Sequence, residues 1–365
     1  MKATSPFARV PLMALGMLAL LAAMWAGLVR IGWALPPLRP NWIANHGPLM
    51  ISGFLGTVIS LERAVALSSI STGLNRRWPY LAPMLAGLGA LSTLIGLPDP
   101  VGRTLVAIGS LGMVLIFAVI NRARPDWAHA TMGVGALLWL MGNILWLLGQ
   151  PVYHVVPWWA GFLVLTISGE RLELARVLLL KRTTLVLFLA ANGFFLASLL
   201  LSLVHLGTGV RFGGIGLIAI ALWLLRFDIA RKTIQQTGLT RFIAACLLPG
   251  YVWLAAAGGL WLYWGERFAA GPLYDAMLHS IMLGFVFSLI FGHAPLIVPA
   301  VMNVAVPYRP AFYAHLALLH LSLILRVAGD LASSPALRMW GGMLNVIALL
   351  LFLANTARAA RQSAY

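Results

Sequence analysis

The sequence predicts an all-α integral membrane protein with twelve transmembrane helices, and three observations support this fold class. Hydrophobic residues make up 61% of the 365 residues, whereas only 9% are charged. A soluble domain carries about 25% charged residues. Apolar runs long enough to cross a bilayer, which takes ~20 residues, recur along the chain, and the basic residues gather on alternate connections between them. The composition excludes a cytosolic enzyme, a disordered protein and a secreted disulfide scaffold, so the expected partner is the lipid bilayer.

Twelve apolar runs divide the chain into spans joined by short connections, none of them long enough to form a separate domain. We therefore predict one polytopic membrane domain over residues 1–365. The spans are predicted at residues 10–33, 46–67, 80–98, 104–121, 127–149, 157–178, 183–205, 212–230, 240–264, 274–297, 311–329 and 339–358.

The basic residues predict the orientation of the chain. With the N-terminus inside, 18 of the 25 Lys and Arg residues fall on inner segments and 7 on outer segments. The positive-inside rule then places both termini in the cytoplasm, in agreement with an even number of spans. The net charge of +16 is thus a topology signal, and no nucleic-acid partner is expected. Lys2 and Arg76 are among the inner residues.

Tryptophans near the ends of the predicted spans are typical of an interfacial aromatic belt. They are Trp33, Trp42, Trp78, Trp127, Trp158, Trp159, Trp261, Trp264 and Trp340.

An internal repeat relates the second and sixth spans at an offset of 108 residues. The shared pattern is H-x6-G-F-L-x3-I-S-x-E-R, beginning at His46 and at His154. A weaker copy in the tenth span contains Gly284-Phe285, with His279 two residues out of register. A repeat at every fourth helix predicts a pseudo-three-fold arrangement of four-helix units, near residues 1–121, 122–230 and 231–365. This arrangement resembles the haem-copper oxidase core subunit, whose second, sixth and tenth helices carry metal-ligating histidines.

Ionisable residues within an apolar span are costly and therefore mark candidate sites. On the predicted topology, His46, His154 and His279 lie at the outer ends of their spans. His293 lies toward the inner end of span ten and His320 lies within span eleven. Each of them is either a metal or haem ligand, because a neutral imidazole nitrogen binds metals, or an interfacial or capping side chain. On a straight helix, His279 and His293 would share a face about 21 Å apart, too far to bind one iron.

Paired charges end the second and sixth spans at Glu62-Arg63 and Glu170-Arg171. One interpretation is that they are interfacial ion pairs that anchor the helix ends. The other is a polar inner cluster that includes Glu173 and Arg176 and admits protons.

Two further features are expected toward the ends of spans. Arg326 and Asp330, spaced i and i+4 near the outer end of span eleven, are expected to anchor that helix at the surface. Near a haem, Arg326 would instead hold a propionate. Gly292-His293-Ala294-Pro295 and Pro299 predict that span ten ends in a broken, turn-rich segment.

Short motifs resemble those of the NnrS family. His46-Gly47-Pro48-Leu49-Met50 followed by Gly53-Phe54 resembles the histidine-led second helix of these twelve-span membrane proteins. Gly292-His293-Ala294-Pro295 resembles that family's Gly-His-Thr-Gly-Arg-Pro segment, His279 its preceding histidine, and Leu325-Arg326-Val327 its penultimate helix.

The resemblance implies a haem- and copper-containing protein of the bacterial inner membrane, associated with nitric-oxide stress and denitrification. It implies haem b held by His46 and His279 as axial ligands, with His154, His293 and His320 as secondary candidates and nitric oxide as a diatomic ligand. Gly47 and Pro48 stand where the family has a second histidine and a glutamate, so haem is favoured over copper.

Two other functions stay open alongside haem binding. The first is a proton-coupled transporter or channel for a small solute, in which Glu62, Glu170 and His293 form a protonatable inner cluster. Interfacial histidines suit a non-catalytic assembly or scaffold protein. The chain has no His-His pair and no His-Pro-Glu motif, so oxygen reduction is not expected, and the sequence leaves open whether the protein is an enzyme.

Overall fold

A computed structural model describes residues 9–36, 38–70 and 77–362 of the chain. Within these ranges all regular structure is helical, with no strand. Lys2 and Arg76, which entered the predicted charge asymmetry, lie outside the described residues.

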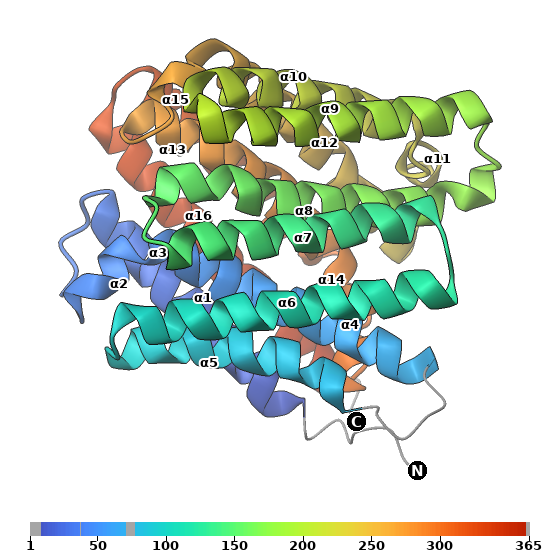
Figure 1. Ribbon diagram of the computed structural model, residues 1–365, viewed down its shortest axis with the longest axis horizontal. Helices are drawn as coiled ribbons and strands as arrows, with labels where there is room; N and C mark the ends of the chain where they lie inside the picture. The colour runs from blue at the N-terminus through green and yellow to red at the C-terminus, as the bar shows by residue number, and fades with distance from the viewer. Residues whose placement is uncertain (1–8, 37, 71–76, 363–365) are drawn as a thin grey trace. The chain divides into compact units, whose positions relative to one another are not determined.

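The α-helices vary from short connecting turns to long spans (Figure 1). They are α1 (Val10–Arg30), α2 (Pro40–Ala44), α3 (His46–Pro48), α4 (Gly56–Ile70), α5 (Leu81–Ile95), α6 (Asp99–Ala123), α7 (Trp127–Leu147), α8 (Val152–Leu174), α9 (Arg182–Val204), α10 (Leu206–Phe227), α11 (Ala230–Thr233), α12 (Gly238–Trp264), α13 (Pro272–His279), α14 (Ser288–Met302), α15 (Phe312–Leu331) and α16 (Pro335–Gln362). Two π-helical segments, η2 (Leu49–Leu55) and η6 (Ser280–Phe287), and three 3₁₀ turns, η3 (Trp78–Tyr80), η4 (Ala175–Leu178) and η5 (Gly265–Arg267), complete the list.

The described part of the chain contains twelve helical segments long and apolar enough to span a membrane, which confirms the predicted number. Their ends agree with the predicted spans to within a few residues. The largest difference is at span eight, which begins at Leu206 rather than at residue 212. The apolar runs therefore located the spans well, because helix length in a bilayer follows directly from hydrophobic length.

Helix ends use the residues expected for them. Pro272 occupies the first turn of α13, where its missing N–H has no helical acceptor. The Asp126 carboxylate caps α7 by accepting from the backbone N–H of Ala128 at 2.9 Å. His205 caps α10 in the same way, since its Nδ1 accepts from the Thr208 N–H. His205 is thus a capping residue of an ordinary helix start.

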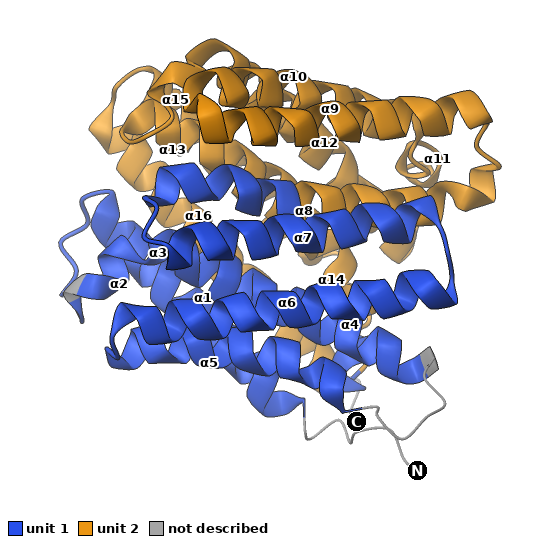
Figure 2. Cartoon of the chain, in the orientation of Figure 1, with its two compact units in different colours: residues 1–162, 297–304 blue, residues 163–296, 305–365 orange. Residues whose placement is uncertain are grey.

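The chain forms two compact units (Figure 2), and each is described by itself. Unit 1 comprises residues 1–162 and 297–304, and unit 2 comprises residues 163–296 and 305–365. In unit 1, α5 packs against α6 and α6 against α7, so these three helices lie side by side (Figure 1). In unit 2, α10 packs between α9 and α12, and α15 packs along α16. The arrangement of three four-helix units stays a prediction.

Three of the tryptophans predicted in an interfacial belt are instead buried in the core. Trp158 is 2% exposed, and Trp159 and Trp261 are fully buried. Two of these indoles have an internal acceptor: Trp159 Nε1 donates to Asn143 Oδ1 and Trp261 Nε1 to the Met277 carbonyl. An indole whose N–H is satisfied inside the protein does not need the interface.

Span ten does not break at its prolines. The segment from Ser288 to Met302 is one α-helix that includes Pro295 and Pro299, so the predicted turn-rich ending is wrong. Proline is tolerated within a membrane helix where neighbouring groups satisfy the freed carbonyls. The irregularity of this span lies earlier, in the π-helical segment η6, where the sequence shows no proline.

Close helix packing in unit 2 depends on two facing glycines. A Cβ atom at Gly258 of α12 would lie 2.6 Å from the carbonyl oxygen of Gly214 on α10, and a Cβ at Gly214 would collide with the Gly258 carbonyl. Only glycine allows the two backbones to approach this closely.

We expect Gly258→Leu to lower the free energy of unfolding by at least about 1–3 kcal/mol, the usual cost of overpacking. The measurement is the thermal midpoint of the purified protein in detergent. Gly259→Leu is the matched control, because a Cβ at the neighbouring Gly259 meets no atom within 4 Å. Equal midpoints for the two variants would contradict the packing described.

Candidate functional site

His46 is the first residue of the short helix α3, which leads into the π-helical segment η2 of unit 1 at Leu49. Its Nδ1 is 2.7 Å from the Ala23 carbonyl oxygen on α1. A carbonyl only accepts hydrogen bonds, so Nδ1 carries the proton and Nε2 carries the lone pair in the neutral ring. The ring packs on Gly27, where a Cβ atom would lie 2.8 Å from His46 Cε1. Helix α1 therefore sets both the tautomer and the position of this imidazole.

The segment η2 is held in place by a buried polar network. Ser52 Oγ donates to Asn143 Oδ1 at 2.9 Å, and Trp139 Nε1 donates to Ser52 Oγ at 3.1 Å. Trp159 Nε1 donates to the same Asn143 oxygen. A Cβ at Gly56, directly after η2, would collide with the Trp139 ring. The widened π turn is thus fixed by side chains of α7 and α8, and single π turns are frequent at functional sites.

His279 also precedes a π-helical segment: in unit 2 it is the last residue of α13, directly before η6. Its Nδ1 lies 3.0 Å from the Asp275 carbonyl oxygen and 3.3 Å from the Asp275 carboxylate. Nδ1 is therefore the protonated nitrogen here too. An imidazole whose Nδ1–H bonds to a carbonyl or carboxylate is the usual arrangement of a histidine that binds metal through Nε2.

Asp275 is in turn held by arginine. Arg326 on α15 donates to both of its carboxylate oxygens, at 2.8 and 2.9 Å. Asp330 pairs with Arg338 on α16, whose Nε is 3.0 Å away. Arg326 is 7% exposed and Asp330 is 1% exposed. The predicted surface anchor is therefore wrong: Arg326 and Asp330 are buried, and each pairs with a residue of another helix.

The π-helical segments support the repeat between the second and tenth spans. Placing Gly53-Phe54 on Gly284-Phe285 shifts the numbering by 231 residues and puts η2 onto residues 280–286, almost all of η6. The same irregularity thus falls at the same place in both copies, and each follows a histidine. The straight-helix relation between His279 and His293 does not hold, because η6 changes the rotation between them.

The sixth span departs from this pattern. Helix α8 is α-helical from Val152 to Leu174, with Pro157 inside it and no π-helical segment. His154 lies near its start, where its ring is 4.8 Å from the ring of Tyr153. The sixth span matches the second best in sequence, yet it lacks the π-helical segment that the second and tenth spans share.

His293 belongs to a different cluster, at the other end of span ten. Its Nδ1 donates to the Leu289 carbonyl at 2.7 Å, which leaves the Nε2 lone pair to face Arg171 Nη1 at 3.4 Å. The Glu170 carboxylate lies 3.7 Å from the same Nε2. The structure thus brings together Glu170 and His293, two members of the protonatable inner cluster expected of a transporter, and adds Arg171 to them.

Arg171 is the centre of this cluster. It donates through Nε and Nη2 to the two carboxylate oxygens of Asp228, at 2.7 and 3.0 Å, and both side chains are almost fully buried. Tyr251 lies beside the pair, and its buried hydroxyl makes no hydrogen bond within the described chain. Glu62 and Arg63 of unit 1 instead pair with each other, 3.1 Å apart. The two Glu-Arg motifs, Glu62-Arg63 and Glu170-Arg171, therefore make different contacts.

His320 has both ring nitrogens engaged. Trp253 Nε1 donates to its Nδ1 at 3.1 Å, so Nε2 carries the proton and faces Ser288 Oγ at 3.2 Å. Ser288 Oγ donates onward to the Cys246 carbonyl at 2.6 Å. Metal binding by His320 would break this chain, so its geometry favours a structural role.

The candidate histidines have different surroundings. His46 lies in unit 1 and His279 in unit 2, each with Nδ1 hydrogen-bonded to a carbonyl oxygen. His293 lies in the Arg171 cluster. Within residues 9–36, 38–70 and 77–362, no three His, Cys, Asp or Glu side chains come together in a group that could hold a metal ion.

A comparison with protein families matches residues 9–361 to one described as a domain of unknown function, DUF8744. The chain belongs to the DUF8744 family. The match covers all twelve spans, so the family is defined over the whole membrane domain. No curated protein matches the sequence of this DUF8744 protein significantly.

Sequence reasoning missed Asp228, Tyr251 and Asp275 as parts of these sites. Asp228 follows span eight, where an acidic residue is typical of a solvated helix end, and its partner is 57 residues away. The one feature of the sequence that pointed to them is the small number of acidic residues, nine in the whole chain. An acid close to a span is costly unless it is paired.

We expect Asp228→Asn to destabilise the DUF8744 protein by about 3–5 kcal/mol, because it leaves the buried Arg171 charge without its counter-ion. Asp99→Asn is the control: it removes a partly exposed pair with Arg103, usually worth about 0–1 kcal/mol. The measurement is unfolding in mixed micelles. The double variant R171M/D228L should be more stable than D228N, since it removes both charges. If D228N matches D99N, the pair is not buried as described.

Proposed function

We propose that this protein binds haem b, with His46 and His279 as the axial ligands, and that it responds to nitric oxide or a related redox stress at the bacterial inner membrane. The observation that carries the proposal is the shared local structure of the two histidines. Each precedes a π-helical segment, and these segments occupy equivalent positions of the repeat.

The chemistry of the donors fits haem iron. A ferrous or ferric haem takes a neutral imidazole nitrogen as axial ligand. Both rings carry their proton on Nδ1, so Nε2 has the lone pair that such a bond requires. The buried Asp275 carboxylate next to His279 favours a fixed ring orientation. His129 and His293 also have Nδ1 next to a carbonyl oxygen, so what sets His46 and His279 apart is the π-helical segment that follows each of them.

The bound haem would supply an iron to which a diatomic ligand would bind in place of one of the two imidazoles. The chain's own part would be to hold the haem and to provide an apolar surrounding that a small uncharged gas enters readily. The link to nitric oxide rests on the resemblance of His46-Gly47-Pro48 and Gly53-Phe54 to NnrS proteins. Copper is not part of the proposal.

We expect the protein purified from haem-replete cells to show a Soret band that is lost or strongly reduced in His46→Ala and in His279→Ala. Loss of one axial ligand changes the spin state and weakens the binding of haem. The measurement is the absorbance spectrum together with pyridine haemochrome quantification, which also identifies the haem type.

His129→Ala and His205→Ala are the matched controls and should leave the spectrum unchanged, because these histidines cap or flank ordinary helix starts. Gly27→Ala tests the position of His46, since its methyl group would displace the imidazole, and should shift the band. Absence of a Soret band from wild-type protein, or a band unchanged in both alanine variants, would overturn the proposal.

A second candidate function is favoured by the contact between Glu170 and His293. The 3.7 Å separation of these groups, next to the Arg171–Asp228 pair, joins protonatable side chains of α8 and α14. Glu170 is 24% exposed and His293 is 11% exposed by side chain, and Arg171 contacts both His293 and the buried Asp228 carboxylate. Such a cluster suits proton-coupled transport of a small solute.

We expect infrared difference spectra between acidic and neutral pH to contain a carboxyl band that is absent in Glu170→Gln and shifted in His293→Gln. The shift follows from loss of the imidazole beside the carboxylate. Glu266→Gln is the control, because Glu266 is half exposed and lies next to Arg211 instead. A Glu170 band that His293→Gln leaves unchanged would count against this function.

A further inference from the structure

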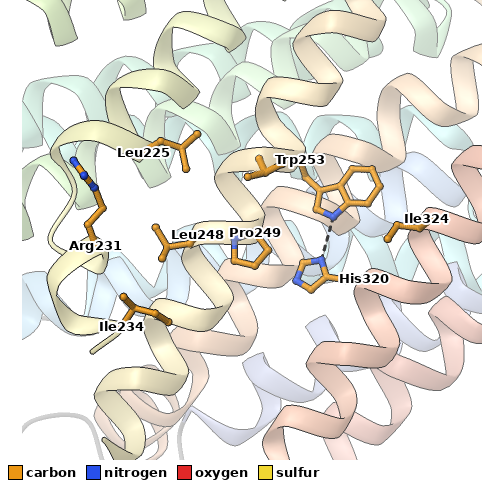
Figure 3. A pocket seen from close by; sticks show the side chains of 9 residues that line it. Leu225, Arg231, Ile234, Leu248, Pro249, Trp253, His320 and Ile324 are labelled. Carbon is orange, nitrogen blue, oxygen red and sulfur yellow. Dashed lines mark hydrogen bonds between the residues drawn. The ribbon is translucent and has the colours of Figure 1, made fainter. Parts of the chain in front are cut away.

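An apolar groove of about 760 Å³ lies in unit 2, between α10, α11, α12 and α15 (Figure 3). Its apolar wall includes Leu248, Val252 and Ile324, and its basic end is Arg231. Val252 is 57% exposed and Ile324 is 55% exposed, so the groove opens to the outside of the unit. Its volume is in the range of small-molecule binding sites.

The polar groups along the wall are satisfied by each other. The Trp253 N–H points to His320 Nδ1, as the dashed line in Figure 3 shows, and His320 Nε2 faces Ser288. Pro249 has no backbone N–H. The wall therefore offers its occupant an apolar surface and no vacant hydrogen-bonding group, which favours a hydrocarbon chain.

Arg231 gives the groove a charged end. Its Nη1 donates to the Arg226 carbonyl at 2.9 Å, which holds the guanidinium at the end of α10. A guanidinium has five N–H donors, and within the described chain no carboxylate pairs with this one. Arg226 and Lys232 add two further exposed cations nearby. A planar guanidinium with vacant donors is well suited to a phosphate group.

The charged end and the apolar wall belong to the same groove, because Arg231 lines it together with Leu248 and Trp253. A ligand with an anionic group joined to a hydrocarbon chain therefore matches the lining of this groove.

We propose that this groove binds one anionic phospholipid, with the headgroup phosphate on Arg231 and an acyl chain along Leu248, Val252, Trp253 and Ile324. The net charge of the headgroup is recognised by Arg231 together with Arg226 and Lys232. This site is separate from the proposed haem ligands, so its test succeeds or fails independently of haem binding.

The test is native mass spectrometry of the full-length protein, delipidated in a neutral detergent and supplied with phosphatidylglycerol or phosphatidylcholine of identical acyl chains. We expect one retained phosphatidylglycerol and weaker retention of phosphatidylcholine. Arg231→Gln should reduce the affinity for phosphatidylglycerol by about fivefold or more. Val252→Trp should reduce binding of both lipids, because the indole fills the groove.

Arg211→Gln is the matched control, since it removes the same charge at the opposite end of α10. Thermal midpoints of all variants show that they are folded. Equal retention of the two lipids overturns the assignment of an anionic headgroup. Equal affinities of R231Q and R211Q, or no effect of V252W where that variant is folded, overturns the assignment of the groove.

Discussion

The structure depends on one constraint: within the membrane-spanning segments, a polar side chain must find its partner inside the protein. With nine acidic and 25 basic residues in 365, each buried charge can be followed individually. Arg171 takes Asp228, Arg326 takes Asp275, and Asp330 takes Arg338. Each pair joins two different helices, and for Arg171 and Arg326 the partner is more than 50 residues away. The pairs form because an unpaired charge in hydrocarbon costs more than the ordering of two side chains.

The same constraint explains how the histidines differ. Both ring nitrogens of His320 are hydrogen-bonded, one to Trp253 and the other to Ser288, which gives this histidine a structural role. His46 and His279 donate from Nδ1 to carbonyl oxygens, which sets their tautomer. The π-helical segment after each of them places the following turn differently from that of an α-helix. A histidine's chemistry in this protein is thus decided by what its Nδ1 contacts rather than by its depth in the membrane.

Much of the fold was predictable because span length and composition are local properties. The twelve spans followed from hydrophobic length alone, and the repeat between spans two and ten followed from Gly-Phe and a nearby histidine. The candidate site was predictable only as a set of residue types. Glu170 and His293 were both placed in the protonatable cluster of the transporter hypothesis, but the pairing of Arg171 with Asp228 was not predicted, since it joins residues 57 positions apart. Arg326 was assigned to the surface because its partner Asp275 is on another helix.

The sequence by itself determined that the protein is a twelve-span membrane protein with few charges. It also determined which rare polar residues are candidates for a site. The tertiary structure decided which of those residues pair, where π turns replace α turns, and which tryptophans are buried. The physical reason is that hydrophobicity acts on each segment separately. Hydrogen bonds and ion pairs instead depend on distances between helices, which only their packing determines.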